Sequence, residues 1–112
     1  MLSFQRLDVY RRAIELLVLA NDITAELPQG HAERADQLLR AAESVVRNIA
    51  EGAGRWSRGD SAKHFRIARG EAMEAAASLD VLRLKTLVND NHYARSERLL
   101  EAIVGMLTKM ST

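Results

Sequence analysis

The amino-acid sequence predicts an all-α protein, a single antiparallel up-and-down four-helix bundle that spans residues 1–112. Three observations support this prediction. Apolar residues recur at steps of three and four along four stretches of the chain. One proline and six glycines are too few for the many turns of a β-sandwich or β-barrel. A length of 112 residues is enough for one hydrophobic core but not for two.

The first predicted helix runs from about Phe4 to Leu27 and carries two interleaved apolar stripes. One stripe contains Leu7, Tyr10, Ile14 and Leu17, and the other contains Val9, Ala13, Leu16, Ala20, Ile23 and Leu27. Together they form an apolar face wider than one neighbouring helix would cover, so we expect an oligomer that buries the remainder. Pro28 and Gly30 then end the helix and turn the chain.

The second predicted helix begins at His31 or Ala32 and ends at Ala53, where Gly52 and Gly54 are the expected stop signals. Its apolar stripe consists of Ala35, Leu38, Ala42, Val45 and Ile49. The opposite side carries polar residues at helical spacing, namely Arg40, Ser44, Arg47, Glu51 and Arg55. This pattern predicts that one face lies in the core and the other in solvent.

The third predicted helix, which is the longest, runs from about Arg58 to Val88, with Ser57 as its N-cap and residues 89–91 beyond its end. Its inward face is predicted to contain Phe65, Ala68, Ala72, Ala75, Ala76, Leu79, Leu82 and Leu87. The middle of this face is mostly alanine, so a neighbouring helix can approach closely while larger side chains opposite fill the space.

The fourth predicted helix runs from about Tyr93 to Met110 and has a heptad-like apolar stripe. This stripe consists of Leu99, Ile103, Leu107 and Met110. Because the connections between successive helices are short, neighbouring helices must run antiparallel. His31 and His92 lie next to turns, where we expect them to be exposed.

Electrical charge is distributed unevenly along the chain. The formal net charge is only +1, but residues 34–69 contain eight basic and four acidic side chains, a net charge of +4. A polyanion could use such a basic segment. The alternative is an ordinary solvated helix face, which is commonly charged.

No motif in the sequence predicts catalysis or the binding of a metal or cofactor. Cysteine is absent, and no Glu stands three residues before any of the three histidines, as carboxylate-bridged metal bundles require. Ser61 and His64 could share a helix face, but the first turn of an exposed helix offers no oxyanion hole. Gly52-Ala53-Gly54 follows a helix instead of a strand and lacks the G-K-[ST] of a phosphate loop. We therefore expect a protein that is not an enzyme and that has no metal site and no cofactor.

The chain is also expected to be cytoplasmic and not to bind a membrane. The N-terminus lacks the basic-then-apolar order of a signal peptide. The longest apolar run, from Leu16 to Ala20, is far too short to span a bilayer.

The connection between the second and third helices is the one place where chemistry-bearing residues gather. Arg55, Arg58 and Lys63 surround Trp56, the only tryptophan, and basic residues beside an aromatic ring suit a nucleic-acid contact. The alternative, which we favour, is that Trp56 packs as a lid over the end of the bundle. Asn48 is expected to be partly buried and to satisfy backbone groups of this loop.

Residues 40–55 read R-A-A-E-S-V-V-R-N-I-A-E-G-A-G-R, which resembles the signature of the "four helix bundle protein" family, R-A-A-x-S-I-x-x-N-I-A-E-G-x-G-R. That family includes proteins encoded in intervening sequences of bacterial large-subunit ribosomal RNA genes, and a relative is the accessory protein of diversity-generating retroelements. Further matches are Phe4, Leu7, Val9, Leu27, Pro28, Ser57, Phe65, Ile67, Ala68, Gly70 and Glu74. Two positions depart from the pattern, Glu71 in place of a usual Ser and Val46 in place of a frequent Pro.

The resemblance implies the bundle fold, a homo-oligomer with a ring of five subunits favoured, and nucleic-acid binding. In the retroelement relative it also implies contact with a reverse transcriptase. We therefore predict a non-catalytic homo-oligomer, a pentameric ring, that binds structured nucleic acid, RNA before DNA. The candidate phosphate contacts are Arg40, Arg47, Arg55, Arg58, Lys63 and Arg66. The alternative is a protein–protein interaction adaptor with no nucleic-acid role, which the near-neutral total charge favours.

Overall fold

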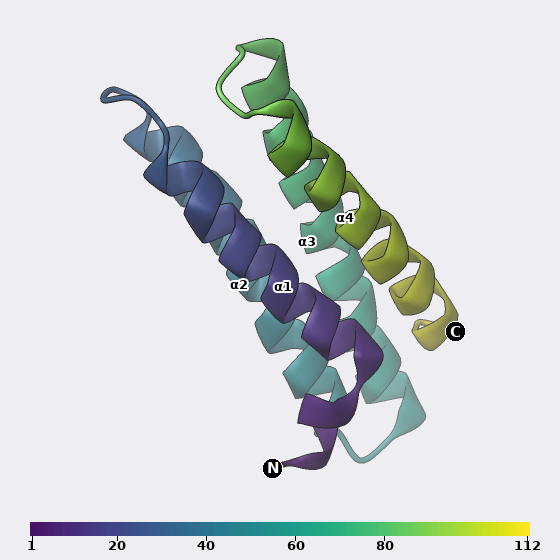
Figure 1. The fold of residues 1–112 in the computed structure, drawn as a ribbon. Helices are drawn as coiled ribbons and strands as arrows, with labels where there is room; N and C mark the ends of the chain where they lie inside the picture. Colours follow the sequence, from purple (N-terminus) through teal and green to yellow (C-terminus); the bar gives the residue numbers. More distant parts are fainter.

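The computed structural model describes all 112 residues and contains four α-helices and one short 3-10 helix. These elements are η1 (Ser3–Arg6), α1 (Asp8–Ala25), α2 (Ala32–Ala53), α3 (Arg58–Leu84) and α4 (Asp90–Met110). The four α-helices lie side by side in a rod of 45 × 24 × 21 Å, and successive helices run in opposite directions (Figure 1). The predicted antiparallel four-helix bundle is thus confirmed.

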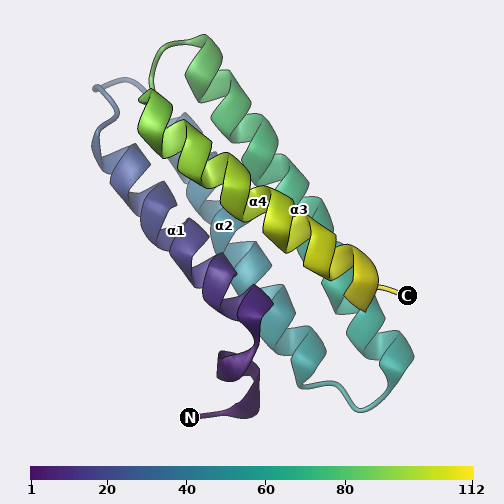
Figure 2. The same ribbon diagram turned by 45° about the vertical axis from the view of Figure 1, so that its right-hand side comes forward.

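Each helix packs against two others, so that the bundle closes in the order α1, α2, α3, α4 and back to α1. The diagonal pairs, α1 with α3 and α2 with α4, have no Cα atoms within 8 Å of each other, and α1 and α3 lie at opposite corners of the bundle (Figure 2). The α2–α3 connection lies at the end of the bundle where η1 also packs, and the other two connections lie at the opposite end (Figures 1 and 2). None of the helices combines the length and apolar character that crossing a membrane requires.

The predicted apolar stripes form one continuous core. On α3 this core is built from small side chains, since Ala68, Ala72 and Ala75 are completely buried. Larger residues of the other helices fill the remaining space, among them Leu38, Ile49, Leu16, Ile103 and Leu107. Ile14 is an exception to the predicted stripes, because it stays 36% exposed.

The structure corrects the predicted boundaries of the helices at three places. Residues 3–6 form a separate 3-10 helix, so α1 begins at Asp8 instead of Phe4. The third helix ends at Leu84 instead of Val88, because Thr86 takes a left-handed conformation with φ 60°. The fourth helix begins at Asp90 instead of Tyr93.

Backbone hydrogen bonds explain why α3 stops early. The Leu87 N–H donates to the Leu82 carbonyl at 2.8 Å, and the Thr86 N–H donates to the Arg83 carbonyl at 3.0 Å. This is a Schellman motif, which normally places glycine where Thr86 stands. Leu87 then packs against the core from outside the helix.

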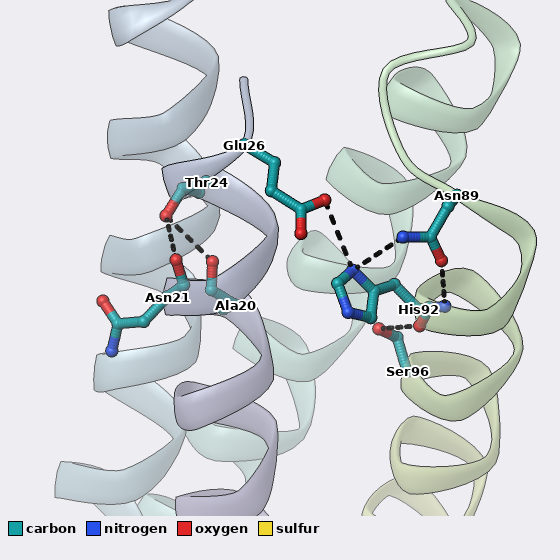
Figure 3. A network of polar contacts seen from close by, with 7 residues as sticks. All are labelled: Ala20, Asn21, Thr24, Glu26, Asn89, His92 and Ser96. Atoms are coloured by element: carbon teal, nitrogen blue, oxygen red, sulfur yellow. Dashed lines mark hydrogen bonds and ion pairs between the residues drawn. The ribbon is translucent and has the colours of Figure 1, made fainter.

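The start of α4 is held by a polar network at the same end of the bundle (Figure 3). The Asn89 side chain caps the helix by accepting the His92 N–H at 2.7 Å. His92 Nδ1 lies 3.2 Å from Asn89 Nδ2 and 3.9 Å from a carboxylate oxygen of Glu26, which follows α1. The buried Ser96 hydroxyl donates to the His92 carbonyl at 2.8 Å. The expectation that His92 is exposed was therefore wrong, since its side chain is only 17% exposed and links α1 to α4.

Gly52 is needed for helix packing and does not stop α2, contrary to prediction. The helix continues through Gly52 to Ala53, and the buried Gly52 faces the ring of Phe65 on α3. A Cβ atom added at Gly52 would lie 2.6 Å from Cε1 of that ring. Any side chain here would therefore force α2 and α3 apart.

We predict that Gly52→Ala lowers the free energy of unfolding by about 1–3 kcal/mol through overpacking against Phe65. This loss outweighs the gain of roughly 1 kcal/mol that alanine gives over glycine in a helix. The matched control is Gly105→Ala in α4, where nothing lies within 4 Å of the added Cβ, so that the substitution is expected to stabilise. Urea denaturation of both variants measures the difference, and a Gly52→Ala protein as stable as the native chain would contradict this packing argument.

Candidate nucleic-acid interface

The six predicted phosphate contacts all lie on the outside of the bundle, on α2, on α3 and in the connection between them. Arg40 and Arg47 project from α2, with side chains 79% and 75% exposed. Arg55 follows α2, and Arg58 is the first residue of α3. Lys63 and Arg66 lie farther along α3, also exposed.

Three of the six candidates already have an acidic partner one helical turn away. Guanidinium nitrogens lie 3.0 Å from a carboxylate oxygen in the pairs Arg40–Asp36 and Arg47–Glu43, and 2.9 Å in the pair Arg55–Glu51. The outer face of α2 therefore alternates in sign and is not uniformly positive. Exposed pairs of this spacing contribute only about 0.3–0.5 kcal/mol each, so a phosphate could displace the carboxylates at little cost.

The remaining candidates divide into two kinds. Arg58 and Lys63 form no ion pair and no side-chain hydrogen bond, which leaves both charges available to a ligand. Arg66, by contrast, donates to the Ser111 carbonyl at 3.0 Å and so joins α3 to the end of α4. Arg69 does the same at 2.8 Å to the Thr108 hydroxyl.

The structure brings Arg47 and Arg55 together with Trp56 around one hollow at the end of α2. This hollow is open to solvent, has a volume of about 590 Å³ and is lined by Arg47, Ala50, Glu51, Gly54, Arg55 and Trp56. We call it the α2-end hollow. Arg40 and Arg66 do not line it, since Arg40 lies two helical turns before Arg47 and Arg66 is turned to α4. Arg58 and Lys63 do not line it either, so Arg55 is the only cation of the predicted cluster around Trp56 that does.

The predicted lid function of Trp56 was wrong. Its side chain is fully exposed, at 103% of the reference area, and contributes nothing to the core. Phe65, packed beneath Gly52, already fills the space between the ends of α2 and α3.

The sequence model of the family described as "23S rRNA-intervening sequence protein" matches residues 5–109. The chain belongs to this family. It is also similar to the crystal structure of a protein of unknown function from the S23 ribosomal protein family of Bacteroides thetaiotaomicron, with a TM-score of 0.84 and 24% sequence identity over 93% of this chain and 98% of that one. At that identity the likeness bears on the fold alone. No curated protein matches the sequence.

In this 23S rRNA-intervening sequence family protein, the signature-like segment 40–55 has an inward side that serves helix packing. We had expected Asn48 to hydrogen-bond to backbone groups of the loop, but it links α2 to α3 instead. Its amide nitrogen donates to the Ser44 carbonyl at 2.9 Å, which leaves its oxygen to accept from His64 Nδ1 at 3.3 Å. The half-buried position of Asn48 could have indicated a partner on another helix, but only the packing identifies His64.

A second hollow lies between α3 and α4 and has the wrong electrostatic sign for a polyanion. It measures about 490 Å³, with an apolar floor that includes Leu79, Leu100 and Val104 and with Asp80, Glu97 and Glu101 among its lining. The Tyr93 hydroxyl donates to Asp80 at 2.6 Å, and this hydrogen bond raises the pKa of Tyr93. The structure contains no group of three or more His, Asp or Glu side chains arranged to hold a metal ion.

Glu71, where the chain departs from the family pattern, stands next to another acid on the same helix. Partial burial raises the pKa of Glu71 from its usual 4.5, and hydrogen bonding and repulsion from Glu74 raise it further. The folded chain therefore holds this proton more tightly than the unfolded chain. The stability that protonated Glu71 contributes is therefore present below the pKa of the unfolded chain. It is lost as the pH rises through the higher pKa of the folded chain.

We predict that Glu71→Gln raises the stability of the fold at pH 7, because the amide resembles the protonated carboxyl and removes the repulsion. The gain should be small, below about 1 kcal/mol, because the side chain is largely solvated. It should vanish near pH 3, where the native carboxyl is protonated.

Thermal unfolding at the two pH values measures this effect. Glu74→Gln is the matched comparison, and the double variant should gain less than the sum of the two single changes, because one repulsion is removed twice. Equal gains at both pH values would contradict the electrostatic explanation.

Proposed function

We propose that this protein is a non-catalytic, cytoplasmic homo-oligomer that binds structured RNA through the outer surface around the α2–α3 connection. The observation that carries the proposal is that Arg47, Arg55 and Trp56 line one hollow, with the unpaired Arg58 next to it in the chain. Proteins bind single-stranded and looped nucleic acids with basic side chains, which contact the phosphates, and with exposed aromatic rings, on which bases stack. Membership in the family described as "23S rRNA-intervening sequence protein" supports RNA as the first choice of ligand.

Charge pairing limits what one subunit can contribute. Of the six candidates, only Arg58 and Lys63 are unpaired cations without another bond, so a single chain should bind weakly. An oligomer repeats the same surface in each subunit. An RNA that reaches two or more subunits then binds more tightly, because each further contact forms at a high effective concentration. No new kind of contact is needed.

Two exposed apolar faces support the oligomer. The outer face of α3 carries four exposed apolar side chains, Ile67, Met73, Val81 and Leu84. The small residues Gly70 and Ala77 lie between them at helical spacing, and Glu74 is the charged residue on this face. The outer face of α1 carries the exposed Ile14 and Val18.

These two faces lie at opposite corners of the bundle, because α1 and α3 are a diagonal pair. A two-fold dimer would cover only like faces, whereas contact between the α1 face of one copy and the α3 face of the next covers both. Contacts between unlike faces form a closed ring when the rotation that relates one subunit to the next divides a full turn evenly. We propose a ring of five, in accordance with the family resemblance.

We predict that Val18→Glu and Val81→Glu each abolish the oligomer without unfolding the chain, because both side chains lie outside the core. Mixing the two variants is the sharper test. One variant keeps its α3 face and the other its α1 face, so the mixture should form a dimer that neither forms alone.

Light scattering measures the masses, and Arg98→Glu on the exposed side of α4 is the control. A native chain that is monomeric at micromolar concentration would refute the oligomer. Variants that stay monomeric when mixed would instead refute the unlike pairing of faces.

We predict that labelled structured RNA binds the native protein and that the affinity falls steeply as salt rises, because phosphate contacts release counterions. Fluorescence anisotropy across a salt series gives the slope. In the double variant Arg55→Glu with Arg58→Glu, each lost phosphate contact should reduce that slope by about one. Arg98→Glu, on the exposed side of α4 in its first half, is the matched control and should leave binding almost unchanged.

Unchanged binding by the double variant would show that this surface is the wrong one. Absence of binding by the native protein even at low salt would remove the RNA function. The adaptor would then be the working hypothesis, which the acid-lined apolar hollow between α3 and α4 favours.

A further inference from the structure

Trp56 is exposed to an extent that the fold does not explain. Tryptophan is among the most buried side chains on average, yet this one has its whole surface in solvent, with 103% exposure. It stands in the short connection between α2 and α3, with Arg55 before it and Arg58 two residues after it. Trp56 also lines the α2-end hollow.

The connection that presents Trp56 is fixed at both ends. The Gly54 N–H donates to the Ala50 carbonyl at 3.1 Å, which closes α2. The Ser57 hydroxyl accepts the Asp60 N–H at 3.1 Å, which caps α3. The indole ring is thus held out from the bundle by an ordered turn, so that binding a flat ligand would require little ordering of the backbone.

The chemistry of the α2-end hollow fits a nucleotide better than a bare anion. The hollow is lined by residues of the last turns of α2, where carbonyl groups and the helix dipole are negative, and by the carboxylate of Glu51, which pairs with Arg55. The cations Arg47 and Arg55 line it as well. A phosphate alone would be repelled by the negative helix end, whereas a base can donate its amino and imino protons there while its phosphates meet the arginines.

We propose that Trp56 is a stacking platform for an unpaired nucleobase of the bound RNA. This inference rests on the proposed function and narrows its ligand to RNA with an accessible single-stranded loop. In a continuous duplex the faces of the bases are covered by their neighbours, so no base could stack on Trp56. Stacking on an aromatic side chain is tolerant of sequence, because every base has a π-face.

The test uses the fluorescence of Trp56, the one tryptophan of the chain, excited at the red edge of the indole absorption so that the two tyrosines do not contribute. The native protein is titrated at low salt with three RNAs: a single strand of roughly 12 nucleotides, within the span of single-strand sites, a hairpin with an open loop, and a long duplex at the same total phosphate concentration, in which the uncovered faces of the end base pairs are few. Quenching by the single strand and the hairpin, but not by the duplex, is the expected result.

Substitutions separate stacking from charge. Trp56→Ala should weaken binding of the single strand roughly 5- to 100-fold, as the loss of one stacked base does, with an unchanged salt slope. Trp56→Phe keeps an aromatic face and should retain most of the affinity. Arg58→Glu should instead lower the salt slope for all three RNAs.

Three outcomes would overturn the stacking proposal. If Trp56→Ala binds as the native protein does while Arg58→Glu weakens binding, the stacking is wrong and the proposed function stands. If the native protein binds none of the RNAs, both fail together. If Trp56→Ala changes the mass of the oligomer and Trp56 fluorescence follows protein concentration without RNA, the ring is buried between subunits and is no platform.

Discussion

The close approach of α2 and α3 is the constraint on which the rest of the bundle depends. It is possible because the buried face of α3 is built from small residues, with Ala68, Ala72 and Ala75 completely buried. At its end the ring of Phe65 occupies the volume that a side chain at Gly52 would need. Because these contacts fix where α2 ends and α3 begins, they also fix the turn that carries Arg55 and Trp56. The geometry of the candidate site therefore follows from the packing of side chains that no ligand would touch.

The two sides of α2 serve different purposes. The inward side of residues 40–55 is explained by folding, through Ala41, Ala42, Ile49 and the hydrogen bond from His64 to Asn48. This is why family membership is strong evidence for the fold and adds little about activity. The outward side carries arginines that are paired with acids one turn away. A segment with a net charge of +4 thus presents a surface whose free cations are concentrated at the start of α3.

The arrangement of the helices relates the proposed oligomer to the candidate site. The apolar outer faces of α1 and α3 point in opposite directions across the bundle, while the α2–α3 turn lies at one end of the rod (Figure 2). In the proposed ring with all bundles pointing the same way, the subunit contacts would use the sides of the rods and leave the ends open. Each copy of the α2-end hollow would then lie on the same rim. Weak single contacts would be repeated along that rim, which suits a long and flexible polyanion.

The sequence by itself determined the four helices, their order and nearly all of the core, because helical periodicity, the N-cap at Ser57 and the turn at Pro28 are local properties of the chain. It also indicated that Arg55 and Trp56 would lie together at the α2–α3 connection, but not that Arg47 from the preceding helical turns would join them in place of Arg58 and Lys63. It did not determine the end of α3, since a β-branched Thr86 in a left-handed conformation is unfavourable until Leu87 packs back on the core. Nor did it determine the exposure of Trp56, the partner of Asn48 or the role of Gly52. Those features depend on which side chain from another helix already fills the available space, and only the tertiary structure decides that.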